Sequence, residues 1–313
     1  MIGAIDIGGT KLAVGIVNDD GIVLARLETP TGVASTYSSG LENITAMLSQ
    51  TAKSTGTKIT GIGIGSTGPV NPFSGEFGEI DFLPGWRKNN PVRDLSESFG
   101  VQVAMENDAD AGALGEAGWG AGKGKSRLIY ITVGTGIGGG LVFDGELYRG
   151  VGGAHPEIGH QVVDPSGPQC SCGFRGCWES LATGPAMAAW FHSQNIGNTR
   201  EQLTAEHICN LASHGDLLAR RAITREAHYL GLGLANLITI FTPDVIVLGG
   251  SVMKSAVLFL DGIRRTICSG CKFVPFEQTE IALASLGDDA NLIGAARVWY
   301  NRFGQQTKHR AQS

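Results

Sequence analysis

The 313-residue sequence lacks the features that would indicate nucleic-acid binding, membrane insertion or export. It contains no long run or stripe of Lys and Arg, and its formal net charge is −5, so nucleic acid is not expected as a partner. No apolar run reaches the roughly 18 residues that a membrane helix needs. The first residues, MIGAIDIGGTK, include no basic segment followed by a cleavable apolar one. We therefore expect a cytoplasmic protein that contacts no membrane.

A Pro- or Ser-rich linker is also missing, although the chain is long enough for two domains. The pattern strand, Gly-rich turn, strand, acidic-Gly turn, strand occurs at 2–28 and again at 127–149. We interpret this as an internal duplication that gives two halves with a cleft between them. The other expected elements are strands at 59–65, 101–105 and 244–250, and helices at about 36–54, 216–241 and 288–301.

Glycine is abundant, with 47 residues gathered in short clusters between apolar runs. Two clusters match G-x-G-x-x-G, namely Gly134-Gly136-Gly139 and Gly63-Gly65-Gly68. Neither opens a helix, so a dinucleotide site is excluded by context. GAGKGKS at 120–126 is not a P-loop, because Trp119 stands where the first glycine should be and a strand follows.

The tips of the two repeated hairpins are nearly free of side chains, so their backbone N–H groups can face an anion. Thr10 and Thr135 add hydroxyls, Lys11 adds a positive charge, and the Asp6 carboxylate suits hydrated Mg²⁺. One such turn alone would be an ordinary hairpin. Its repetition at equivalent places in both halves favours phosphate binding.

Three of the six cysteines lie in one short loop, as Cys170-x-Cys172-x4-Cys177. In a reducing compartment such clustering indicates a metal more than disulfides, and a structural zinc takes four ligands. Cys268-x-x-Cys271 lacks partners and is expected to pack near a helix end, whereas Cys209 is expected in the core. His155 is expected to be structural or solvated.

Four segments together resemble the ROK family of sugar kinases: DIGGTK (6–11), ENDADAGALGE (106–116), VGTGIGGG (133–140) and PEIGH…CSCGFRGCWE (156–179). The resemblance implies an α/β fold, the duplicated actin/hexokinase-like (ribonuclease H-like) fold, with two domains around a cleft that binds ATP and sugar. We expect a small N-terminal α/β domain at 1–115, completed by the C-terminal helix at about 289–303. A large C-terminal α/β domain with the zinc loop should span 116–288.

The resemblance also implies roles for single residues. Asp108 becomes the general base, while Glu106 and Asp110 are not expected to be catalytic. On the bare pattern, Asn107 or Asp108 could simply cap a helix, and Gly249-Gly250 could be a plain turn. The fourth zinc ligand is His160, with Cys170, Cys172 and Cys177. The implied sugar contacts are Gly68, Asn107, Asp108, Glu157, His160 and Glu179. The implied ATP and phosphate contacts are Asp6, Gly8, Gly9, Thr10, Lys11, Gly134, Thr135, Gly136, Gly249 and Gly250.

The expected activity is ATP-dependent phosphorylation of a hexose at its 6-hydroxyl, with Mg²⁺, a structural Zn²⁺ and a homodimer or homotetramer. Glucose is the first candidate, but His155-Pro156 and Phe82 depart from the glucokinase-like pattern, so fructose, mannose and N-acetylhexosamines stay open. A sugar-sensing repressor would need a helix-turn-helix before the kinase-like body, and Met1 directly precedes the first strand. A non-catalytic sugar-binding module is the third alternative, and Asp108 with both Gly hairpins argues against it.

Overall fold

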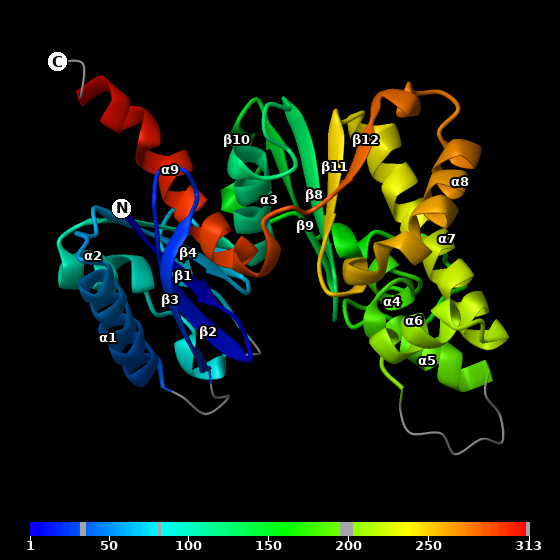
Figure 1. The fold of residues 1–313 in the computed structure, drawn as a ribbon, viewed down its shortest axis with the longest axis horizontal. Coiled ribbons are helices and arrows are strands. Elements are labelled where there is room, and N and C mark those ends of the chain that lie inside the picture. Colours follow the sequence, from blue (N-terminus) through cyan, green and yellow to red (C-terminus); the bar gives the residue numbers. More distant parts are fainter. Residues whose placement is uncertain (32–35, 81–82, 195–202, 311–313) are drawn as a thin grey trace. The chain divides into compact units, whose positions relative to one another are not determined.

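The computed structural model describes residues 1–31, 36–80, 83–194 and 203–310, except the side chains of 305–310. Phe82, singled out above for its sequence, lies outside the described residues. The chain divides into two units, which are described separately (Figure 1). Unit 1 comprises Met1–Leu128, Gly140–Pro156 and Ala284–Ser313, and unit 2 comprises Ile129–Gly139 and Glu157–Leu283. The predicted domain limits at residues 115 and 288 stay a prediction.

The first sheet has the strand order β3-β2-β1-β4-β7. Strand β1 pairs antiparallel with β2 and parallel with β4, and β4 is parallel to β7. The NDDG turn after β2 is closed by the Asn18 side chain, which accepts from Ile22 N at 2.8 Å, and by Gly21 at φ +80°. The strands are β1 (Ile2–Ile7), β2 (Lys11–Val17), β3 (Val23–Pro30), β4 (Gly61–Ser66) and β7 (Gln102–Asn107).

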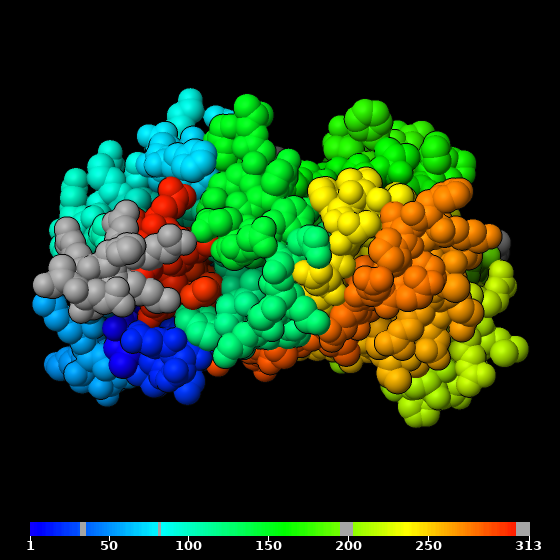
Figure 2. Space-filling view, turned by 90° about the horizontal axis from the view of Figure 1, so that it is seen from above, coloured from blue at the N-terminus to red at the C-terminus, as the bar shows by residue number. Residues whose placement is uncertain are grey.

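Helices cover the first sheet with apolar side chains. On α1, Ile44 and Leu48 pack with sheet residues such as Ile62. On α9, Leu292 and Trp299 pack against Ile2, and Figure 2 shows α9 (red) bordered by blue and cyan segments of the N-terminal sequence. The elements are α1 (Tyr37–Thr55), β5 (Val70–Asn71), β6 (Glu76–Phe77), α2 (Pro91–Phe99), α3 (Asp108–Trp119) and α9 (Ala290–Arg310).

The second sheet has the order β10-β9-β8-β11-β12, which repeats the order of the first sheet strand for strand. This repetition confirms the internal duplication predicted from the sequence. The segment at 120–126 forms turns that lead into β8, so the exclusion of a P-loop is also confirmed. The strands are β8 (Arg127–Val133), β9 (Ile137–Phe143), β10 (Glu146–Leu147), β11 (Val245–Gly249) and β12 (Glu280–Leu283).

The helices of unit 2 pack around the long helix α7, which lies close to the predicted 216–241. Buried residues of α7 include Leu230, Leu234 and Ile238. Within the described residues, no helix has the length and apolar character needed to span a membrane. The helices are α4 (Trp178–Leu181), α5 (Gly184–Gln194), α6 (Ala205–Ser213), α7 (Leu217–Phe241) and α8 (Leu260–Gly270).

Candidate functional site

Asp108 lies in unit 1 where β7 ends and α3 begins. Asn107 is the N-cap of α3, and its Oδ1 accepts from Ala109 N at 2.9 Å, so the capping role considered for Asn107 is confirmed. Asp108 Oδ1 accepts from the same N–H at 2.8 Å. A Cβ atom added at Gly68 would lie 3.1 Å from Asn107 Nδ2. The structure therefore brings Gly68, Asn107 and Asp108 together.

Burial dominates the electrostatics of this junction. It raises the pKa of Asp108, while the Ala109 N–H and His155 oppose the rise. Burial also raises the pKa of Asp6 to about 6, although Asn291 Nδ2 donates to Asp6 Oδ2 at 3.0 Å. The charge of Asp108 further raises the pKa of Asp6. Two desolvated carboxyl groups that repel each other would both gain from a bound cation.

The first Gly-rich hairpin joins β1 to β2, and Gly8 N donates to Lys11 O at 2.9 Å. Thr10 and Lys11 are exposed at its tip. Lys11 Nζ lies 2.6 Å from Glu28 Oε2, and both side chains are about half exposed. Such an exposed ion pair is weak, so Lys11 can turn to another anion at little cost.

The second Gly-rich hairpin joins β8 to β9 and opens onto a cavity of about 1290 Å³ in unit 2. Gly134 N donates to Gly136 O at 3.0 Å, and Gly134 O accepts from Gly184 N at 3.0 Å. Gly250 has φ +91°, and a Cβ atom there would lie 2.3 Å from Val133 O, so this close passage requires glycine. The cavity lining includes Gly134, Thr135, Gly184, His192, Thr204, Glu206, Cys209, Ser251, Val252, Lys254 and Ser255.

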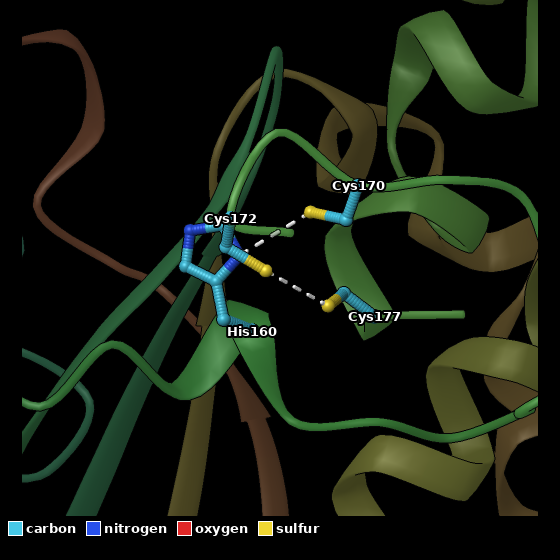
Figure 3. A group of neighbouring side chains, drawn as sticks. All are labelled: His160, Cys170, Cys172 and Cys177. Atoms are coloured by element: carbon cyan, nitrogen blue, oxygen red, sulfur yellow. Dashed lines mark hydrogen bonds between the residues drawn. The ribbon is translucent and has the colours of Figure 1, made fainter. Parts of the chain in front are cut away.

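The predicted zinc ligands lie together in unit 2 (Figure 3). The ligand atoms of His160, Cys170, Cys172 and Cys177 all lie within 4.8 Å of one another. Cys172 Sγ is 3.4 Å from Cys177 Sγ, and Cys170 Sγ is 3.5 Å from His160 Nδ1. None of these cysteines forms a disulfide. A tetrahedral zinc with Zn–S bonds of about 2.3 Å needs sulfur atoms roughly 3.8 Å apart, so the group fits zinc with a small adjustment.

The surroundings of Cys177 oppose ionisation of its thiol unless a cation offsets them. Burial and the neighbouring thiols raise the pKa of Cys177 to about 12, whereas the Phe174 N–H lowers the pKa of Cys172. A zinc ion would deprotonate the coordinating thiols. Because Nδ1 of His160 faces Cys170, Nδ1 would be the metal ligand and Nε2 would stay available.

Two glutamates flank the candidate metal cluster in the sequence. A 3₁₀ turn, Ile158–His160, follows Glu157, and His160 N donates to Glu157 O at 3.0 Å. Glu179 lies in α4, a helix that begins at the residue after Cys177. Its Oε2 accepts a hydrogen bond from Ile137 N at 3.0 Å. Glu179 thus connects the cysteine loop to the second Gly-rich hairpin, a link that the sequence did not indicate.

One feature of the structure was not predicted from the sequence, and one prediction about the cysteines is wrong. The cavity walls from α5, α6 and the 3₁₀ segment Val252–Leu258 carry no motif that could have shown them. Cys209 and Cys271 are buried, as expected, and Cys271 follows the end of α8. The expectation that Cys268 is packed is wrong, because this residue of α8 is exposed.

The family model for the ROK family matches residues 2–302. The chain belongs to the ROK family. A glucokinase of Thermotoga maritima is 32% identical over 96% of this chain and 97% of its own length. Xylose repressors are also similar; that of Bacillus subtilis is 33% identical over 78% of this chain, which spans 62% of the repressor. A glucokinase of Streptomyces coelicolor is likewise 33% identical over 93% of this chain and 95% of its own length, and these full-length matches support a sugar kinase.

Two solved ROK structures show the same fold. A ROK hexokinase from Thermus thermophilus has a TM-score of 0.83 and 33% identity, covering 97% of this chain and 99% of its own. A ROK glucokinase from Streptomyces griseus, in complex with glucose and AMPPNP, has a TM-score of 0.76 and 32% identity, covering 94% and 97%. The predicted actin/hexokinase-like α/β fold is therefore confirmed.

Proposed function

We propose that this ROK protein transfers the γ-phosphoryl group of ATP to the 6-hydroxyl of a hexose, with glucose as the first candidate. The observation that carries the proposal is the placement of Asp108, a buried carboxyl group at a strand-to-helix junction beside Gly68 and Asn107. Phosphoryl transfer to an alcohol needs one carboxylate to accept the hydroxyl proton, and the remaining catalysis is positioning and charge neutralisation.

Asp108 is suited to the role of general base. Burial raises its pKa, which makes the ionised form a better proton acceptor, while Ala109 N–H and His155 help to keep it ionised. Asp6 would hold a hydrated Mg²⁺ ion for the nucleotide, since a cation would offset the repulsion between these two acids. When bound, the ion would neutralise the charge on the phosphates.

We assign the nucleotide to the two Gly-rich hairpins. The cavity of about 1290 Å³ beside Gly134 and Thr135 is large enough for a nucleoside, and the exposed N–H groups at the tips can bind phosphate oxygens. The first hairpin contributes Gly8, Gly9, Thr10 and Lys11. Gly250 lets the backbone pass close to Val133, and Gly249 and Gly250 directly precede Ser251, which lines the cavity.

We assign six residues to the hexose, three at or beside the start of α3 and three beside the cysteine loop. Gly68, Asn107 and Asp108 belong to unit 1, and Glu157, His160 and Glu179 belong to unit 2. Zinc on the three cysteines and His160 Nδ1 would fix the ring plane of His160 and the start of α4, which carries Glu179. The metal would therefore act as a scaffold for hydroxyl-binding side chains.

A coupled ADP-release assay tests the function with glucose, fructose, mannose, N-acetylglucosamine and N-acetylmannosamine. We expect ATP- and Mg²⁺-dependent turnover with glucose, and product oxidised by glucose-6-phosphate dehydrogenase. Asp108→Asn should lower kcat about a hundredfold or more and leave the sugar KM within several-fold, because it removes the base and keeps the shape. Asp261→Asn, at an 85% exposed side chain on α8, is the matched control.

The outcomes separate the alternatives. Turnover with fructose, mannose or an N-acetylhexosamine in place of glucose would support the proposed kinase activity and show that its substrate is another sugar. No ADP release with any of the five sugars would refute a hexose kinase and favour a sugar-binding regulator. Near-normal turnover of Asp108→Asn would show that another group accepts the proton.

A further inference from the structure

A buried contact between a histidine and an aspartate lies next to the proposed base. His155 Nδ1 is 2.8 Å from Asp110 Oδ2, and the two side chains are only 15% and 3% exposed. Asp110 is the third residue of α3, two positions after Asp108. His155 comes from the segment that follows β10 and stands 45 positions later in the sequence. Both residues belong to unit 1.

Asp110 has little compensation for its charge other than His155. Its Oδ1 is fully buried and has no hydrogen-bond partner among the described residues. A Cβ atom at Gly140 of β9 would lie 2.9 Å from this oxygen, so the strand backbone closes over it and leaves no room for a side chain. When a buried carboxylate has a single charged partner, removal of that partner strongly destabilises the folded protein.

The other charged groups around the base are already engaged. Glu106, one residue before Asn107, receives hydrogen bonds from Arg149 and lies 3.4 Å from Arg302 Nη2. Lys11 pairs with Glu28, and Asp6 accepts from Asn291. The charges of Asp6, Asp108, Asp110 and Glu106 thus gather in one region, where His155 lowers and Asp110 raises the pKa of Asp108.

We propose that His155 is a positioning residue, which neutralises Asp110 and so holds the first turn of α3, with Asp108, in the geometry that proton transfer requires. The inference rests on the proposed function of Asp108. His155 departs from the glucokinase-like sequence pattern. In this proposal it affects turnover through Asp110 and not through contact with the sugar.

Kinetics of His155→Ala, Asp110→Asn and the double variant test the pair. His155→Ala should lower kcat about tenfold and leave the KM values for hexose and ATP within about threefold, because it exposes Asp108 to an unpaired buried charge. The double variant should return to within about threefold of wild-type kcat, because Asp110→Asn removes that charge. His228→Ala, at an exposed residue of α7, is the control and should match the wild type.

The same variants decide between charge balance and simple packing. If the histidine ring only fills space, the double variant will have a lower kcat than His155→Ala, and this result would overturn the proposal. An unchanged kcat in His155→Ala would also overturn it. Thermal unfolding gives a readout without activity: the midpoint of the double variant should lie above that of His155→Ala, and a lower midpoint refutes the pairing. If wild type releases no ADP with any hexose, the proposed function fails, while the unfolding midpoints still decide whether His155 neutralises Asp110.

Discussion

Asp6 is a residue whose place in the fold opposes its ionisation. It lies on β1, the central strand of the first sheet, and burial raises the pKa of its carboxyl from 3.8 to about 6. Because the folded pKa lies above the unfolded one, the ionised side chain destabilises the folded state. This cost is absent below pH 3.8, grows between pH 3.8 and pH 6, and is constant above pH 6. We interpret it as a cost that a bound Mg²⁺–nucleotide would offset.

Asp6→Asn should therefore stabilise the nucleotide-free protein while impairing turnover. The midpoint of thermal unfolding should rise more at pH 7.5 than at pH 4.5, because the wild-type carboxylate is ionised in the folded state only at the higher pH. Asn291 can still donate to the new amide oxygen, so the hydrogen bond is kept. Asp20→Asn, at an exposed residue of the β2–β3 turn, is the control. An equal gain at both pH values would contradict the burial of Asp6 as the cause.

At the scale of the element, the cysteine loop combines a candidate metal site with two flanking glutamates. Short turns hold it: Cys170 N donates to Phe174 O at 2.8 Å, and Gly176 N donates to Pro168 O at 2.8 Å. Gly176 has φ +70°, and a Cβ atom there would lie 1.5 Å from Asp164 O, so glycine is required. The loop is thus built to bring Cys177 and the following α4 to a fixed place.

Removing one zinc ligand should loosen the hexose contacts together. Cys172→Ala should lose zinc, raise the sugar KM about tenfold or more and lower kcat, while nucleotide binding at the Gly hairpins survives. His160→Ala should affect the sugar more, since it deletes a proposed contact as well as a ligand. The measurements are elemental analysis, calorimetric sugar titration and binding of a fluorescent ATP analogue.

Cys268→Ala is the matched control for the zinc variants, because this thiol is exposed and lies outside the cluster. Structural zinc contributes on the order of 10–16 kcal/mol of apparent binding energy in small peptides, much of it coupled to folding. Within a larger unit we expect local disorder of the loop. Native protein without zinc, or full sugar affinity in a zinc-free Cys172→Ala variant, would disprove the scaffold.

At the scale of the whole molecule, the sequence predicted the structural features that depend on short local motifs or on repeated patterns. The strand–Gly turn–strand pattern indicated both sheets, and the spacing of Cys170, Cys172 and Cys177 indicated the side-chain cluster that could hold a metal. The pairing of His155 with Asp110 could not be predicted, because the two residues stand 45 positions apart in the sequence and no motif connects them. The cavity beside Gly134 was also missed, since its walls come from helices with ordinary capping signals, such as Thr204 before α6.

Helix α9 shows how distant segments complete unit 1. Gly63 of β4 lies so close to α9 that a Cβ atom there would be 1.8 Å from Ala295 O. Trp299 is 7% exposed, packs over Gly61 and donates from Nε1 to Gln102 O at 3.2 Å. The C-terminal helix thus covers β1, β4 and β7, the three strands that lead to Asp6, Gly68 and Asn107.

Trp299→Ala should consequently destabilise unit 1 and leave unit 2 folded. Truncation of a buried Trp costs about 3–5 kcal/mol, which corresponds to a fall of roughly 6–20 °C in the unfolding midpoint of a unit of this size. Hydrogen exchange followed by mass spectrometry should show faster exchange in 2–17, 61–66 and 102–107, and unchanged protection in 217–249. Phe273→Ala, at a fully exposed residue of unit 2, should change neither. Equal loss of protection in 217–249 would show that the two units unfold as one, and would contradict a separate N-terminal domain completed by the last helix.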